Sequence, residues 1–153
     1  MIDVSLRDFL QTGRFGPVEL GMPSAKVEGF LGAADSLGAS SSRARRPFLW
    51  KYGEVEFHFL PRKGKDDQLV LVFLEHFNVP SGGPKVRIDP WFIRGGLSLD
   101  AVEREFRAAG LKTRSFRREH LQGATELVVE KGASLLFGGE GLYSISFSGD
   151  LEA

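Results

Sequence analysis

The sequence contains no cysteine. This absence excludes disulfide bonds, thiol nucleophiles and metal sites built on thiolate ligands. A cysteine-free chain is also compatible with a reducing compartment. We therefore expect no covalent cross-links, and we interpret the protein as cytoplasmic.

Long apolar runs are missing as well. The N-terminal stretch MIDVSLRDFLQTG carries acidic residues and alternates polar with apolar ones, unlike the basic and then apolar pattern of a signal peptide. No run approaches the roughly 20 apolar residues that cross a bilayer as a helix. The sequence thus predicts no membrane partner.

Neither sign of charge is in excess. Lys and Arg together number 20, as do Asp and Glu, so the formal net charge is zero. Dedicated nucleic-acid-binding proteins usually carry a basic excess that neutralises phosphates. We therefore do not expect nucleic acid as the main partner.

Apolar and aromatic residues, in contrast, are plentiful. Hydrophobic residues make up 42% of the 153 residues, and 13 residues are phenylalanine. Each buried aromatic side chain removes a large apolar area from water, so this chain can build a core without disulfides or metals. Its length predicts one compact domain or two small units that share a core.

The clearest local pattern is the segment FLWKYGEVEFHFL. Apolar residues alternate on both sides of Gly53–Glu54, as in a hairpin with glycine at the first turn position. On one face this register places Tyr52 opposite Val55, Trp50 opposite Phe57, and Phe48 opposite Phe59. On the other face it pairs Lys51 with Glu56 and Leu49 with His58. The hairpin therefore has one apolar face and one partly polar face.

Helical patterns precede this hairpin. Residues 3–11 are expected to form a short helix capped by Asp3, and Val27, Phe30 and Leu31 form the stripe of a second helix that starts near Pro23. Residues 33–46 are rich in Ala, Ser, Gly and Arg, which is typical of a loop.

The run QLVLVFLEHF, after the hairpin, is apolar at successive positions as far as Leu74. Such a run indicates a central strand with material packed on both faces, or with one face kept for a partner.

A second helix-and-hairpin pattern follows at a shift of about 75 residues, which places Val102 on Val27. Its helix would be capped by Ser98 and stopped by Gly110. A strand over 112–118, a hairpin around ELVVEKGASLLF and a last strand LYSISF complete it. Lys131-Gly132 and Gly132-Ala133 are both plausible turns. We predict an α+β fold of tandem helix-plus-antiparallel-sheet units, 1–82 and 83–153, within one compact structural domain.

The stretch VELGMPSAKVEGFLGAAD resembles the opening of the SmpA/OmlA (BamE) family, whose pattern Gly21, Met22, Val27, Leu31, Gly32 and Asp35 match. Pro23 stands in place of the family's capping Thr, and Ala34 in place of its usual Pro. The tandem arrangement is similar to beta-lactamase inhibitory protein. The chain also resembles bacterial proteins with the phrases GRFGP…LGM and WKYG…EFHF. This resemblance implies an architecture that binds proteins across a sheet face.

One cluster of residues has metal-ligand chemistry, and it consists of Glu56, His58, Glu75 and His76. Their spacing lacks an HxH or HxxxH pattern, so ordinary strand-surface residues are the plainer interpretation. We expect no bound metal and no cofactor, and we keep as an alternative a metal-dependent or small-molecule enzyme that uses His58 and His76.

Other catalytic motifs are weak. The chain lacks the GxSxG phrase of a strained nucleophile turn, and Ser98 is better explained as a helix cap. The glycine-rich GGEG at 138–141 has no Lys-Ser/Thr pair after it, so a hairpin turn is the plain interpretation. We therefore predict that the protein is not an enzyme.

Two arginine runs, Arg43/Arg45/Arg46 and Arg114/Arg117/Arg118, occupy equivalent places in the two halves. They are surface charges or a basic patch for an acidic protein, and RNA binding through these loops is a further alternative.

The leading hypothesis is a non-enzymatic protein-binding module, such as an inhibitor or an immunity protein for a toxin or enzyme encoded nearby. The residues expected to bind the partner are Arg43, Arg45, Arg46, Lys51, Glu56, His58, His76 and Trp91.

Overall fold

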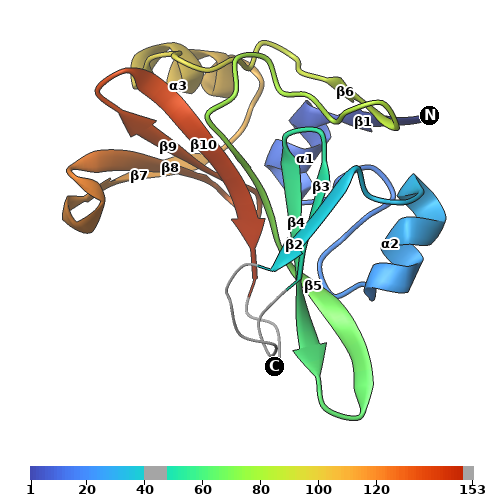
Figure 1. Cartoon of the computed structure of the whole chain (residues 1–153). Helices are drawn as coiled ribbons and strands as arrows, with labels where there is room; N and C mark the ends of the chain where they lie inside the picture. Colours follow the sequence, from blue (N-terminus) through green and yellow to red (C-terminus); the bar gives the residue numbers. More distant parts are fainter. Residues whose placement is uncertain (40–47, 150–153) are drawn as a thin grey trace.

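The computed structural model describes residues 1–39 and 48–149 (Figure 1). Within them, the helices are α1 (Leu6–Thr12), α2 (Ser24–Leu31), α3 (Leu99–Ala108) and a 3₁₀ turn η1 (Glu119–Leu121). The strands are β1 (Ile2–Ser5), β2 (Ser36–Ala39), β3 (Phe48–Tyr52), β4 (Val55–Arg62), β5 (Lys65–Glu75), β6 (Val86–Asp89), β7 (Thr113–Arg118), β8 (Ala124–Val129), β9 (Ser134–Gly138) and β10 (Gly141–Ser148). The predicted α+β class is confirmed.

Most strands form one antiparallel sheet, here called the large sheet. It has eight strands in the order β2-β3-β4-β5-β10-β9-β8-β7. Each half of the chain supplies a helix followed by a meander of strands, and the two meanders meet where β5 pairs with β10. The sheet therefore runs without a break from one half to the other. The tandem duplication itself stays a prediction.

The first hairpin has the predicted register. Tyr52 lies opposite Val55, Trp50 opposite Phe57, and Lys51 opposite Glu56. This register follows from the alternation, since a one-residue slip would turn the apolar residues to the wrong face. The run 68–77 also behaves as predicted, because β5 pairs with β4 on one side and β10 on the other.

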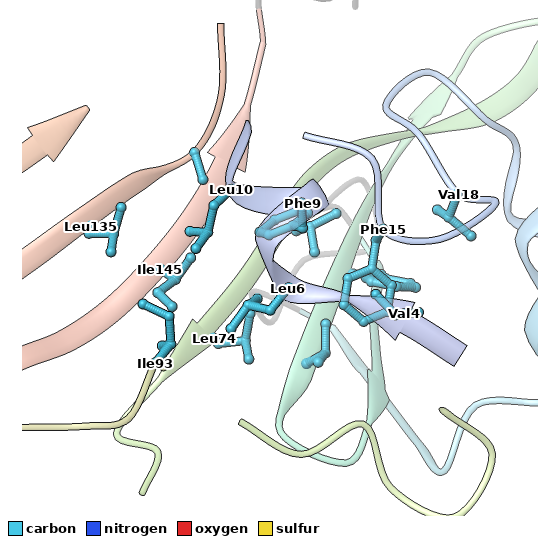
Figure 2. Close-up of a cluster of buried hydrophobic side chains, with 14 of the residues drawn as sticks. Val4, Leu6, Phe9, Leu10, Phe15, Val18, Leu74, Ile93, Leu135 and Ile145 are labelled. Carbon is cyan, nitrogen blue, oxygen red and sulfur yellow. The ribbon is translucent and has the colours of Figure 1, made fainter. Parts of the chain in front are cut away.

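All three α-helices lie on one face of the large sheet, here called the inner face. Their buried residues belong to the same apolar cluster as the buried residues of the strands. Helix α1 lies inside the bend between the two arms of the sheet (Figure 1). Leu10 of α1 points toward Leu135 and Ile145, and Leu6 lies beside Leu74 (Figure 2). One core thus unites residues from both halves.

Aromatic rings extend this core. Phe9 of α1 meets Phe15 edge-on at 5.8 Å, and Phe15 meets Phe57 of β4 edge-on at 5.4 Å. Such perpendicular pairs add to the burial of apolar area. They anchor the N-terminal segment on the sheet.

The helix predicted over 3–11 is wrong in its first part. Ile2–Ser5 is a strand that pairs in parallel with β6, and the helix starts only at Leu6. Its cap is Ser5, whose Oγ accepts a hydrogen bond from the Asp8 amide at 3.1 Å. Asp3 instead forms an ion pair with Arg87. This strand depends on its pairing with β6, which lies more than 80 residues further along the chain. No local pattern reveals such a distant partner.

Two loop predictions also need correction. Residues 36–39, expected as part of a loop, form the edge strand β2 against β3. In the second half, neither predicted turn is correct: the Val129 amide donates to the Ala133 carbonyl at 2.9 Å, which encloses the three residues Glu130–Gly132. Lys131 takes φ 61° there, a left-handed conformation common in three-residue hairpin loops.

Other boundaries agree with the sequence. Ser98 caps α3 through its Oγ, which accepts from the Ala101 amide at 3.1 Å. Gly138–Gly141 forms the β9–β10 hairpin turn. Among the described residues, no helix combines the length and the apolar character required to traverse a bilayer.

Candidate functional site

The face of the large sheet opposite the helices is here called the outer face. Strand registers place alternate residues of each strand on it. In a sheet with one solvated face, these positions are expected to be polar. Several are apolar and only half-buried instead: Leu49, Leu71, Phe73, Val128 and Leu136. This apolar content marks the outer face as the candidate site.

Three predicted site residues meet at one end of this face. Lys51 of β3 lies opposite Glu56 of β4. His58 follows on the same face of β4, and its Nε2 lies 3.1 Å from Glu56 Oε1. The His58 and Glu56 side chains are 14% and 23% exposed, so the pair is largely buried and a small part of each side chain is left at the surface. The hairpin register predicted from the sequence therefore places these three side chains on one face of the sheet.

His76 is not part of that group. It follows β5 at φ 54°, its side chain is 75% exposed, and its ring stacks on Tyr143 with centroids 6.2 Å apart. His58 lies opposite Leu71, so His76 is five residues further along the neighbouring strand, or about 16 Å at 3.3 Å per residue. The two histidines cannot share one metal ion at that separation.

The described ranges 1–39 and 48–149 contain no group of three or more His, Asp or Glu side chains that could hold a metal ion. The pair of Glu56 and His58 offers two ligands, whereas protein zinc sites use three or four. The pair of Glu56 and His58 therefore supplies too few ligands for a protein zinc site.

Trp91 lies on the helix side of the sheet. It takes φ 56° and its ring stacks on Phe106 of α3 with centroids 5.9 Å apart. The Arg7 guanidinium of α1 lies 4.9 Å above the same ring. Trp91 thus packs between α1 and α3, away from the outer face.

Arg43, Arg45 and Arg46 lie outside the described residues, so the structure does not place them. The second arginine run is described and occupies β7, the edge strand at the far end of the sheet.

A polar network crosses the outer face near this edge. The Glu126 carboxylate of β8 accepts hydrogen bonds from Arg118 Nε at 2.6 Å and from Ser134 Oγ at 2.5 Å. Burial raises the pKa of Glu126, but these two hydrogen bonds and the Arg118 charge together outweigh it, so the net pKa is lowered. Glu126 is therefore held ionised between β7 and β9.

Beside this network, two arginines sandwich an aromatic ring. The guanidinium carbons of Arg114 and Arg118 lie 5.2 and 5.1 Å from the Phe116 ring centroid. All three residues are on the outer face because they alternate along β7. Cation–π contacts of this kind hold charged side chains in place. The R-x-F-x-R alternation was the sequence signal for this arrangement, and reasoning from the arginines alone missed the ring.

Three surface clefts of the described residues have features that bear on ligand binding. A cleft of ≈ 630 Å³ between β1, α1 and β6 carries several charged side chains. Asp3 accepts from Arg87 at 2.6 Å, and Arg14 donates to Glu19 at 2.6 Å. The hydrogen bond from Arg87 lowers the pKa of Asp3. Three of the five charged side chains that line this cleft, Asp3, Arg14 and Arg87, are thus held in ion pairs.

The other two clefts differ in character. One of ≈ 670 Å³ lies along the glycine-rich β9–β10 turn next to His76 and Tyr143, and five of its lining residues are glycines, which offer no side-chain groups to a ligand. The last, of ≈ 430 Å³, is here called the cationic cleft and is lined by Lys112, Thr113, Arg114, Val128, Val129, Glu130 and Lys131. Within the described residues, none of its lysines or arginines forms an ion pair with a carboxylate.

The comparisons with known proteins add no family. No protein-family model, no curated protein and no solved structure matches this chain. The resemblance to the SmpA/OmlA family accordingly stays a prediction from a short motif.

Proposed function

We propose that this chain is a non-enzymatic protein-binding module that recognises its partner across the outer face of the large sheet. One observation carries the proposal: outward positions on central strands are apolar where solvent-facing positions should be polar. An apolar patch that stays exposed on a folded protein often marks an interaction site.

The distribution of charge suits a protein partner. The apolar residues Leu71 and Phe73 lie on β5, near the middle of the sheet. Charged groups flank them, with Lys51, Glu56 and His58 toward one end and the Glu126 network toward the other. An apolar centre within a polar rim is the usual anatomy of a protein interface.

The finer parts of the proposal rest on the same surface. A small binding module of this kind fits an inhibitor, or an immunity protein for a toxin or enzyme encoded nearby, acting in the cytoplasm. Repeated element order in the two halves supports an origin by duplication, which would double the width of the recognition sheet.

The test uses affinity-tagged protein in extracts of the source organism. Wild type should recover one protein in stoichiometric amount. The double variant Leu71→Ser/Phe73→Ser should lose it, with affinity for the purified partner reduced at least about tenfold. The matched control is Arg104→Ser/Glu105→Ser, which changes two side chains on the helix side of the molecule.

Thermal unfolding checks that both variants fold. Recovery of no stoichiometric protein by wild type contradicts the proposal. The proposal is also contradicted if Leu71→Ser/Phe73→Ser still binds the partner while Arg104→Ser/Glu105→Ser does not.

A further inference from the structure

The edge strand β7 leaves backbone groups free. The Glu130 amide donates to the Lys112 carbonyl at 2.9 Å, so this opposed pair is hydrogen-bonded. Such pairs alternate along an antiparallel ladder. It follows that Thr113, Ser115 and Arg117 direct their N–H and C=O groups away from β8. No described strand pairs with β7 on that side, and Ser115 and Arg117 are exposed.

The side chains along this edge are cationic and held in place. Arg114 and Arg118 both stack on Phe116. Arg118 is neutralised by Glu126 and Arg117 by Glu119. Arg114, in contrast, forms no ion pair with any described carboxylate, so it presents a positioned charge for an external anion.

The cationic cleft adjoins the first residues of β7, Thr113 and Arg114. Its wall includes Lys112, Arg114 and Lys131 against the single carboxylate Glu130. These three cations are exposed, and apolar Val128 and Val129 form part of the same wall. An acidic side chain entering here would meet net positive charge without displacing an internal ion pair.

Charged residues on an edge strand also have a plainer explanation, because they discourage edge-to-edge aggregation. That role requires only charge. It accounts neither for the ring stacked between two arginines nor for a cleft whose cations continue the line of Arg114.

We propose that β7 accepts an acidic, extended segment of the partner protein as an additional strand. This inference rests on the proposed protein-binding function. The backbone groups of Thr113, Ser115 and Arg117 would form the ladder, which gives affinity in strand addition. Alternate acidic side chains of the added strand would lie on the outer face about 5 Å from the side chains of β7, beside Arg114.

The test measures fluorescence anisotropy of a labelled, end-blocked peptide of alternating Glu and Val on the full chain. We expect saturable binding below about 1 mM, the range of weak complexes. Arg114→Glu should weaken it at least about tenfold, since attraction becomes repulsion. Lys26→Glu, the same charge change at an exposed position of α2, should leave it unchanged.

A second pair of measurements isolates the backbone ladder. Ser115→Pro removes one outward N–H without removing a bond to β8, and proline is tolerated on edge strands. It should weaken binding severalfold. The same peptide with alternate backbone nitrogens methylated should bind the wild-type chain more weakly, to a similar extent. This second measurement tests the ladder even if Ser115→Pro folds poorly.

Absence of binding at about 1 mM peptide overturns the inference. Equal binding of a Lys–Val peptide, or tighter and strongly salt-dependent binding of an oligouridylate, overturns it too, the latter in favour of RNA. If Leu71→Ser/Phe73→Ser loses the partner while Arg114→Glu and Ser115→Pro retain it, the protein-binding function stands and strand addition fails.

Discussion

The Tyr52 hydroxyl donates a hydrogen bond of 2.7 Å to the carbonyl oxygen of Gly32. This contact joins the end of β3 to the residue that follows α2. Tyr52 is fully buried. The hydrogen bond thereby satisfies both a buried hydroxyl and the end of a helix, two polar groups that would otherwise be costly to bury.

Replacing this hydroxyl should destabilise the fold. Tyr52→Phe leaves the ring in place and removes the donor, so we expect the free energy of unfolding to fall by about 1 kcal/mol. Urea denaturation measures it. Tyr143→Phe is the matched control, because Tyr143 is half-buried and its hydroxyl forms no described hydrogen bond. Equal losses in both variants would show that the Gly32 contact contributes nothing.

Tyr52 should also resist ionisation. Burial, and then the nearby carboxylates of Glu28 and Asp35, raise the pKa of Tyr52 to about 12 from 10.0. An unfolded chain loses this proton near pH 10, whereas the folded chain retains it. The contribution of Tyr52 to stability is therefore complete below about pH 10 and is lost as the pH rises toward 12. An ultraviolet titration comparing wild type with Tyr143→Phe should resolve a late-titrating tyrosine, and its absence would contradict the burial of the hydroxyl.

Glu126 gives the opposite dependence on pH. Its pKa is lowered in the folded protein from 4.5, so its contribution to stability is present above about pH 4.5 and is lost as the pH falls through the lowered value. Glu126→Gln should cost about 1 kcal/mol at pH 7, because Arg118 loses its charged partner. The difference from wild type should vanish near pH 2.

Denaturation at the two pH values measures this difference. Glu130→Gln, on an exposed carboxylate without a described ion pair, should match wild type at both. A Glu126→Gln effect that persists unchanged in acid would mean that shape, not charge, matters at this position.

Gly132 should not tolerate a side chain. A Cβ at this position would lie 2.0 Å from the Leu10 carbonyl oxygen, which already accepts the Ala133 amide at 2.9 Å. Gly132→Ala should cost about 1–3 kcal/mol through overpacking. Gly139→Ala, in the next hairpin turn with no atom within 4 Å of its Cβ, should be near neutral. Similar thermal stability of the two variants would show that the turn does not press on α1.

Local periodicity predicted much of this fold. The hairpin register around Gly53, the Ser98 cap and the central position of β5 each follow from a few neighbouring residues. The pattern failed where the partner is distant. Ile2–Ser5 becomes a strand only because Val86–Asp89 lies beside it, and the short strand β2 depends on β3 for its ladder.

The candidate site was predictable to a similar degree. Lys51, Glu56 and His58 came together because one register fixes all of them. His76 lies apart from them because it follows the end of β5. The sequence does not show how far this strand extends before the chain turns. The Glu126–Ser134 contact links β8 with β9. The alternation of residues along β8 places Glu126 on the outer face. Nothing local in the sequence indicates that Arg118 of β7 would bind its carboxylate.

The pairing of β5 with β10 has a consequence for synthesis of the chain. Helix α1 is synthesised more than 100 residues before Leu135 and Ile145, yet its Leu10 packs against both (Figure 2). A nascent chain that stops after β5 would therefore display an unpaired strand edge. Its helix α1 would be docked through Leu6 and Phe9 but would leave Leu10 uncovered. Premature termination should yield aggregation-prone fragments, and the order of translation runs against the order in which the core can close.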